Sequence, residues 1–331
     1  MRTYPLVIAC ILAPLGACGG DDDGAVGDPA DAAGRIDAGT PDAAAPDAAL
    51  LDGLWFVMDS IRIPETASEA TSLALDLDSD TRRDNALGGL LAALHNQTEL
   101  AIAGAQQDAV EAGDVLMLVG IDAASLDDDP SVPLQVSRAD DLDGDAGDNF
   151  SGAEPFALVP LDGADGQLDG RLAGGRVRGG PGTIPIELAI VGVTPQVIAL
   201  RGVGGRIVAA ASDDGLTLGR LGAAFSEAEV DEVLIPALAI GFDSIVQRDC
   251  PGGVCEPGTQ GEELATFFDD NEDGMVTVEE LRANSLIAST VGNPDLDLFD
   301  ADGAFNPNVD GVRDSLSLGL GFTAVGARAY Q

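Results

Sequence analysis

Residues 54–63 read LWFVMDSIRI, and residues 316–322 read LSLGLGF near the other end of the chain. The second stretch alternates large apolar residues with Ser and Gly, which is typical of a strand that buries one face. The first stretch is rich in aromatic and β-branched residues and is also β-like. We expect the last strand to return to the sheet begun at Leu54. This pairing would join both ends of the folded part into one body.

The sequence between these stretches mixes helical and β patterns. Residues 86–112 predict two helices broken near Asn96, and residues 115–121 predict an apolar strand. Residues 156–211 predict short strands, with Gly202–Gly205 interpreted as a turn. Ser226 and Glu229 form a capping-box pattern at the start of a further helix. We therefore predict an α+β fold with a mainly-β body over residues 51–225, sandwich-like or irregular, and a helical region with a final strand over residues 226–331.

The composition limits the classes of partner. Aromatic residues make up only 4 % of the 331 residues, so the core is expected to be aliphatic. The chain has 57 acidic residues and 16 basic ones, all Arg, and its formal net charge is −41. This charge disfavours nucleic acid and electrostatic docking on anionic lipids. It favours the binding of cations.

The N-terminus predicts export. Residues 6–15 form an apolar run too short to cross a bilayer but suited to a signal peptide. The run ends in Leu15-Gly16-Ala17-Cys18, which resembles the lipobox of bacterial lipoproteins, and the alternative is a plain secretory signal. The resemblance implies cleavage after residue 17, lipidation of Cys18 and an outer-membrane location facing the periplasm or the cell surface. Residues 18–50 are rich in Asp, Ala and Pro and predict a disordered tether.

Two further cysteines remain in the mature chain. Cys250 and Cys255 flank a short segment with Pro and two Gly, and in an oxidising compartment we expect them to form a disulfide. The alternative is half of a metal site, but no second Cys pair or nearby His completes it.

One segment indicates a metal ion. Residues 269–280 read DDNEDGMVTVEE and resemble an EF-hand calcium loop at every diagnostic position, with flanking helical patterns. Calcium prefers six to eight hard oxygen ligands, and Gly274 permits the sharp bend that such a loop needs. The alternative is a solvated acidic turn. The resemblance implies Ca²⁺ ligands from side chains, one backbone carbonyl at Met275 and a bound water at Thr277: Asp269, Asn271, Asp273, Met275, Thr277 and Glu280.

Weaker acidic patterns occur elsewhere. Residues 76–84 resemble calcium loops of the thrombospondin-repeat or dockerin type, and residues 141–148 are similar; the alternative is again a capped, solvated loop. A further acidic cluster over residues 295–314 lies where a degenerate partner of the EF-hand is expected, although it lacks the Gly and Glu spacing. The possible further ligands in the first two loops are Asp76, Asp78, Asp80 and Asp84, and Asp141, Asp143, Asp145 and Asp148.

No residue pattern in the chain indicates a catalytic mechanism. The one histidine, His95, lies among Leu and Ala on a predicted helix, and zincin, nucleophile-elbow, Walker and Rossmann motifs are absent. We therefore expect a non-catalytic, membrane-anchored lipoprotein whose loops are stabilised by calcium and whose protein or glycan partner is not identified by the sequence. The alternatives are a glycosidase-like enzyme that uses only carboxylates, with structural calcium, and a calcium sensor.

Overall fold

The computed structural model describes residues 49–331. The predicted signal peptide, Cys18 and nearly all of the predicted tether lie outside the described residues. Within this part, none of the helices combines the length and hydropathy needed to span a membrane.

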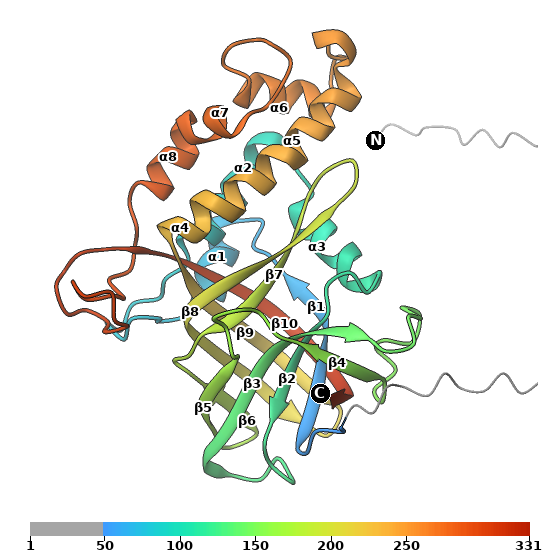
Figure 1. Cartoon of the computed structure of the whole chain (residues 1–331), viewed down its shortest axis with the longest axis vertical. Helices are drawn as coiled ribbons and strands as arrows, with labels where there is room; N and C mark the ends of the chain where they lie inside the picture. The colour runs from blue at the N-terminus through green and yellow to red at the C-terminus, as the bar shows by residue number, and fades with distance from the viewer. Residues whose placement is uncertain (1–48) are drawn as a thin grey trace, which may run out of the picture. The chain divides into compact units, whose positions relative to one another are not determined.

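The sheet closes on itself through a ring of eight antiparallel strands (Figure 1). Each neighbouring pair in the ring β1-β2-β3-β5-β6-β8-β9-β10 is hydrogen-bonded, and β10 pairs in turn with β1, with Phe56 opposite Gly326. The strands of the ring are β1 (Leu54–Arg62), β2 (Met117–Ile121), β3 (Asp129–Asp141), β5 (Gln167–Leu172), β6 (Arg176–Gly179), β8 (Gln196–Ser212), β9 (Gly215–Ser226) and β10 (Ser315–Tyr330).

Two strands lie outside the ring. β4 (Pro155–Val159) pairs antiparallel with β3 and parallel with β10. β7 (Ile184–Ile190) pairs with the first half of β8. The α+β class with a mainly-β body is confirmed; the sheet closes into a cylinder instead of stacking as two layers, because β10 pairs with β9 along one edge and with β1 along the other.

The interpretation of Gly202–Gly205 as a turn is wrong, because these residues lie inside β8. The pairing register shifts between Val203 and Arg206, and Gly204 has φ +63°. A bulge of this kind bends a strand. The first half of β8 can therefore pair with β7 and the second half with β6.

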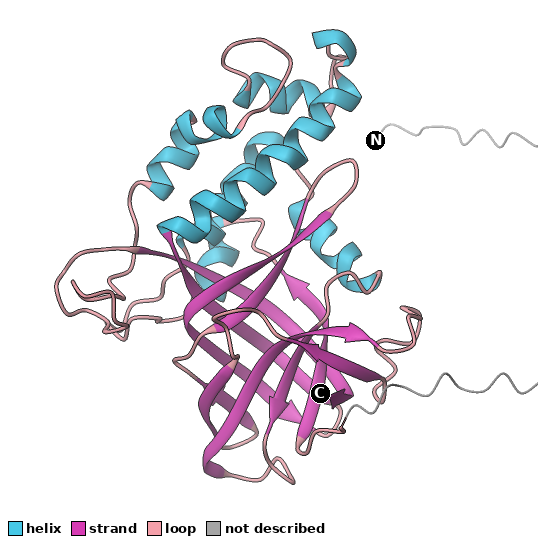
Figure 2. Cartoon of the chain, viewed as in Figure 1, coloured by secondary structure: helices cyan, strands magenta, loops and turns pink. Residues whose placement is uncertain are grey.

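Helices gather at one end of the cylinder (Figure 2). α3 packs on β1 and β7, where the buried Gln106 side chain accepts a hydrogen bond from Ala189 N (2.8 Å) and donates one to Glu187 O (3.4 Å). The helices are α1 (Ala67–Leu73), α2 (Ala86–Thr98), α3 (Ile102–Glu111), α4 (Glu227–Glu229), the π-helical η1 (Val230–Leu234), α5 (Ile235–Asp249), the 3-10 turn η2 (Pro251–Gly253), α6 (Gln260–Phe268), α7 (Val278–Ala283) and α8 (Ser285–Val291).

The core is aliphatic, as the composition predicts. Alternate residues of the ring strands point inward, among them Met58, Val119 and Leu318, and their cluster continues into the helices around Phe242. Burial of each such side chain contributes roughly 1.5–3 kcal/mol.

The outer face of the cylinder is covered in two places. Trp55 and Phe156 belong to a cluster beneath β4. Leu77 and Leu298 belong to a second cluster, where the loops of residues 74–85 and 292–314 lie on β8 and β9. Acidic residues are concentrated in these covering loops. The packing of the loops on the sheet therefore fixes where the candidate sites lie.

Candidate metal centre

The loop between α1 and α2 gathers three carboxylates. One oxygen of each of Asp76, Asp78 and Asp84 lies within 4.8 Å of the others. The loop is shaped by its own backbone: Asp76 Oδ2 accepts from Thr81 N (3.2 Å), and Asp84 Oδ2 accepts from Leu77 N (3.3 Å). Asp76 Oδ1 is buried without a hydrogen-bond partner. These groups could hold a cation, which would neutralise their charges.

The charges in this loop repel one another. Burial, followed by the neighbouring carboxylates of Asp78, Asp295 and Asp80, raises the pKa of Asp84 to about 6. Asp80 is not in the group of three; it accepts from Arg82 N (2.7 Å) and lies 3.8 Å from the Arg82 guanidinium. A divalent cation would replace this repulsion by attraction.

The loop after β3 forms a second group, which includes a residue that the sequence analysis missed. Oxygens of Asp141, Asp143 and Glu154 lie within 4.8 Å of one another. Glu154 is only 9 % exposed, and its neighbour Arg328 on β10 donates its backbone N–H to Glu154 O (2.8 Å). Glu154 follows Asp141 by thirteen residues. A search for a closing glutamate after the three alternating aspartates would have found it.

Asp145 and Asp148 have different positions in the second loop. Asp145 accepts from Gly147 N (3.0 Å) and does not belong to the group of three. Asp148 Oδ1 is buried without a partner, and burial and then the charges of Asp143, Asp145 and Asp141 raise the pKa of Asp148. The pKa of Glu154 is raised by burial and then by Asp148, Asp143 and Asp141. The charges of Asp141 and Asp143 therefore raise the pKa of both Asp148 and Glu154.

The EF-hand-like loop lies between α6 and α7. Asp269 accepts from Asp273 N (3.1 Å) and Gly274 N (2.8 Å), and Asn271 Oδ1 also accepts from Asp273 N (2.8 Å). Gly274 has φ +81°, as the sharp bend requires. The described residues contain two groups of three acidic ligands within 4.8 Å, and neither includes this loop.

The closing glutamate of this loop is buried. Glu280 Oε2 accepts hydrogen bonds from Thr277 N and Thr277 Oγ1 (both 2.9 Å). Thr277 Oγ1 in turn caps α7 by accepting a hydrogen bond from Glu280 N (3.2 Å). Glu280 Oε1 has no partner, and the residue is 8 % exposed. Met275, whose carbonyl is the predicted backbone ligand, is exposed.

The acidic cluster over residues 295–314 is not the partner of the EF-hand-like loop, so that expectation is wrong. Val276 N, which would face a partner loop, donates to Asp243 Oδ1 on α5 (3.0 Å). The cluster instead lies beside the first loop, where Asn308 Nδ2 donates to Asp78 O (2.7 Å). Its Asp297 is 6 % exposed, and Asp297 Oδ1 is buried without a partner. Leu296 and Leu298 hold the cluster there, because both pack on the outer face of the sheet.

The four loops share one property. In the described part of the chain, every buried carboxylate oxygen without a hydrogen-bond partner lies in one of them: Asp76 Oδ1, Asp148 Oδ1, Glu280 Oε1 and Asp297 Oδ1. Leaving a buried polar group unpaired costs roughly 1–3 kcal/mol, and more for a charged group. Non-glycine residues with positive φ also occur in three of the loops: Ser79, Thr81, Glu272 and Asn308.

Two other predictions have clear outcomes. Cys250 and Cys255 form a disulfide with an S–S distance of 2.08 Å, next to the EF-hand-like loop. His95 lies on α2, and its Nδ1 is 2.7 Å from Leu100 O, which gives the imidazole a local structural contact.

The comparisons with known proteins identify no relative. No family model, no curated protein and no solved structure matches this chain.

Proposed function

We propose that the protein is an exported, lipid-anchored calcium-binding protein in which Ca²⁺ stabilises the loops of a binding or structural domain. The observation that carries the proposal is the set of unpaired buried carboxylate oxygens, one in each acidic loop. A bound cation would give each of them a partner.

The ligand chemistry favours calcium. The groups are carboxylate, amide and backbone oxygens on irregular loops, which suit the variable coordination of Ca²⁺ better than the strict octahedron of Mg²⁺. The described residues offer no Cys or His beside the two groups of gathered carboxylates, so softer transition metals are disfavoured.

Export supports the same assignment. The lipobox resemblance predicts a compartment open to external calcium, and extracellular calcium modules bind with dissociation constants of roughly 10⁻⁴–10⁻³ M. At these affinities the sites are about half to nine-tenths occupied at 1 mM calcium. Calcium is therefore proposed as a constant structural ligand and not as a signal.

The test is a thermal melt of the purified protein in a chelator, in 10 mM CaCl₂ and in 10 mM MgCl₂. A ligand that binds only the folded state, at 100 times its dissociation constant, adds about 2.7 kcal/mol per site. We expect calcium to raise the melting temperature by several degrees and magnesium to raise it less. Identical melting temperatures in all three buffers would contradict the proposal.

A further inference from the structure

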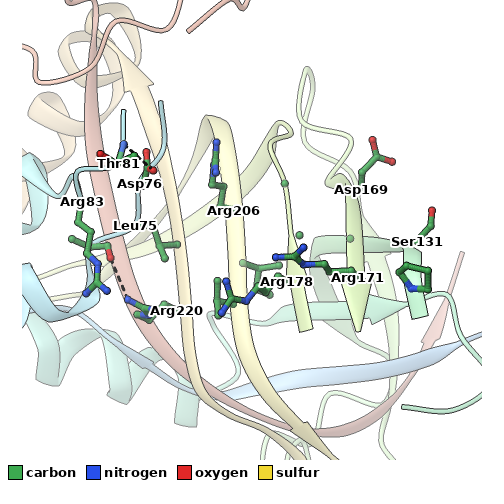
Figure 3. Close-up of a pocket in the computed structure, with 17 residues that line it drawn as sticks. Leu75, Asp76, Thr81, Arg83, Ser131, Asp169, Arg171, Arg178, Arg206 and Arg220 are labelled. Carbon is green, nitrogen blue, oxygen red and sulfur yellow. Dashed lines mark hydrogen bonds between the residues drawn. The ribbon is translucent and has the colours of Figure 1, made fainter. Parts of the chain in front are cut away.

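A third part of the outer cylinder face is strongly basic, against the charge of the whole chain. Five arginines line a groove of about 870 Å³ on β5, β6, β8, β9 and the loop before α2 (Figure 3). We call it the arginine groove and define it by Arg83, Arg171, Arg178, Arg206 and Arg220.

Sheet register explains how residues far apart in sequence meet here. Arg171 on β5 lies directly opposite Arg178 on β6. The same line continues from Arg178 through Val208 on β8 to Arg220 on β9. Side chains at such opposed positions point to the same face, so these three guanidinium groups project outward together. Figure 3 shows them beside Arg206 and Arg83.

The line extends beyond the groove. Arg220 lies opposite Gly321 on β10, and Gly321 lies opposite Arg62 on β1. A Cβ atom at Gly321 would be 3.0 Å from Arg62 Nη2, so the Arg62 side chain lies over this glycine. With neighbouring strands about 4.8 Å apart, the five steps from β5 to β1 follow about 24 Å of the curved cylinder wall. The basic surface is therefore elongated.

These cations are not neutralised by the protein. The ion pairs in residues 49–331 involve Arg82, Arg138, Arg248 and Arg282, none of which lines the groove. Arg206 Nε is buried without a partner, although Arg206 Nη2 donates to Ser79 Oγ (2.6 Å). Like charges opposite one another destabilise a sheet. The repulsion between Arg171 and Arg178 therefore lowers the stability of the folded protein, and a bound anionic ligand would offset it.

The neighbouring positive charges also act on Arg220 within the groove. Partial burial, followed by the like charges of Arg83, Arg178 and Arg176, lowers the pKa of Arg220. Arg176 lies beside Arg171 and Arg178 in an adjoining hollow.

The other groove residues narrow the class of ligand. Asp76, Thr81, Ser131 and Asp169 also line it, and these can accept hydrogen bonds from hydroxyl groups. The residues that line the groove include no aromatic side chain on which a base could stack, and this disfavours single-stranded nucleic acid. The remaining negative charge of the protein opposes a flat anionic membrane.

We propose that the arginine groove binds an acidic polysaccharide, whose carboxylate or sulfate groups pair with the arginines while its hydroxyl groups donate to the acidic and hydroxyl side chains. Arginine suits this role because its planar fork pairs with such anions through two hydrogen bonds. The arginines that bind the anion need no calcium, although Asp76 and Thr81 at the edge of the groove belong to the first acidic loop.

Isothermal titration calorimetry of the purified protein in calcium-free, low-salt buffer tests the proposal. The probes are oligogalacturonate, dextran sulfate, uncharged dextran and single-stranded DNA. We expect binding of at least one charged polysaccharide, weakened by salt, and no binding of dextran. Equal affinity for dextran and dextran sulfate, or tightest binding of DNA, would overturn the proposal.

A matched pair of variants locates the site. Arg171→Ser with Arg178→Ser removes two exposed groove charges, and Arg201→Ser with Arg313→Ser removes two exposed charges elsewhere. The groove variant should bind about tenfold more weakly and the control variant within about twofold of wild type. Equal affinity of the two variants would refute the location.

The fold of the groove variant can be checked independently. Neither Arg171 nor Arg178 makes a side-chain hydrogen bond or ion pair within the described residues, and removing them relieves repulsion. Its melting temperature should therefore equal or exceed that of wild type. The single variant Arg178→Gln should weaken binding about threefold.

Discussion

Substitution of Glu154 by Gln changes one oxygen to nitrogen and removes one charge from the second acidic group. Without metal, the side chain is buried beside Asp141, Asp143 and Asp148, and their charges oppose its ionisation. The variant should then be more stable than wild type in a chelator. With calcium bound, the same change removes a charged ligand and should lower stability. The sign of the effect therefore depends on the metal.

The expected sizes follow from elementary energetics. Relief of like-charge contacts at roughly 0.2–1 kcal/mol each predicts a gain of about 1 kcal/mol in chelator. A hundredfold loss of affinity removes up to about 2.7 kcal/mol of calcium-induced stability. For a domain of this size, about 2–4 °C corresponds to each kcal/mol. The melting temperature of the variant should thus lie about 2 °C above wild type in chelator and about 5 °C below it in calcium.

Differential scanning fluorimetry in both buffers measures this inversion. Glu99→Gln is the matched control, because Glu99 is exposed at the end of α2 and makes no ion pair among residues 49–331. The control should shift by less than about 1 °C in either buffer. A shift of Glu154→Gln in the same direction in both buffers would show that Glu154 is only structural.

Four further outcomes are expected. In chelator, stability should increase as pH falls from 7 towards 5, because the pKa of Asp84 is raised to about 6 in the folded state and protonation favours that state. This stabilisation is lost as pH rises through about 6. A flat or falling stability in pH-dependent melts would contradict the prediction. Cys250→Ser with Cys255→Ser should cost about 2 kcal/mol for so short a loop, measured by denaturant unfolding. Glu280→Ala should reduce the calcium stoichiometry in calorimetry by one, and an unchanged count would refute the EF-hand assignment. Cys18→Ser should abolish lipid labelling, whereas continued labelling would place the anchor elsewhere.

Local patterns were sufficient to predict several elements. The pattern of residues 86–112 predicts two helices, and the structure has α2 and α3 there, separated after Thr98. Ser226 accepts from Glu229 N as the capping-box pattern predicts. These features depend on residues within four positions of each other.

The pairing of the last strand with the strand at Leu54 was predicted and is confirmed, but other features that depend on distant pairing were not predictable. The closure of the sheet depends on the pairing of β10 with β1 and of β3 with β5, and one bulge in β8 sets which strands β8 pairs with. The position of Glu154 depends on β10 as well, through Arg328. The arginine groove could not be predicted because its arginines lie on four separate strands and one loop. The net charge of −41 describes only the whole chain and not the charge of one surface.

A crystal structure of the protein grown in calcium, with anomalous data, would show whether calcium occupies the acidic loops. We predict anomalous peaks at the acidic loops, roughly 2.3–2.6 Å from the oxygens that lack a partner without metal: Asp76 Oδ1, Asp148 Oδ1, Glu280 Oε1 and Asp297 Oδ1. Ordered waters bonded to these oxygens, with no anomalous signal at millimolar calcium, would contradict it.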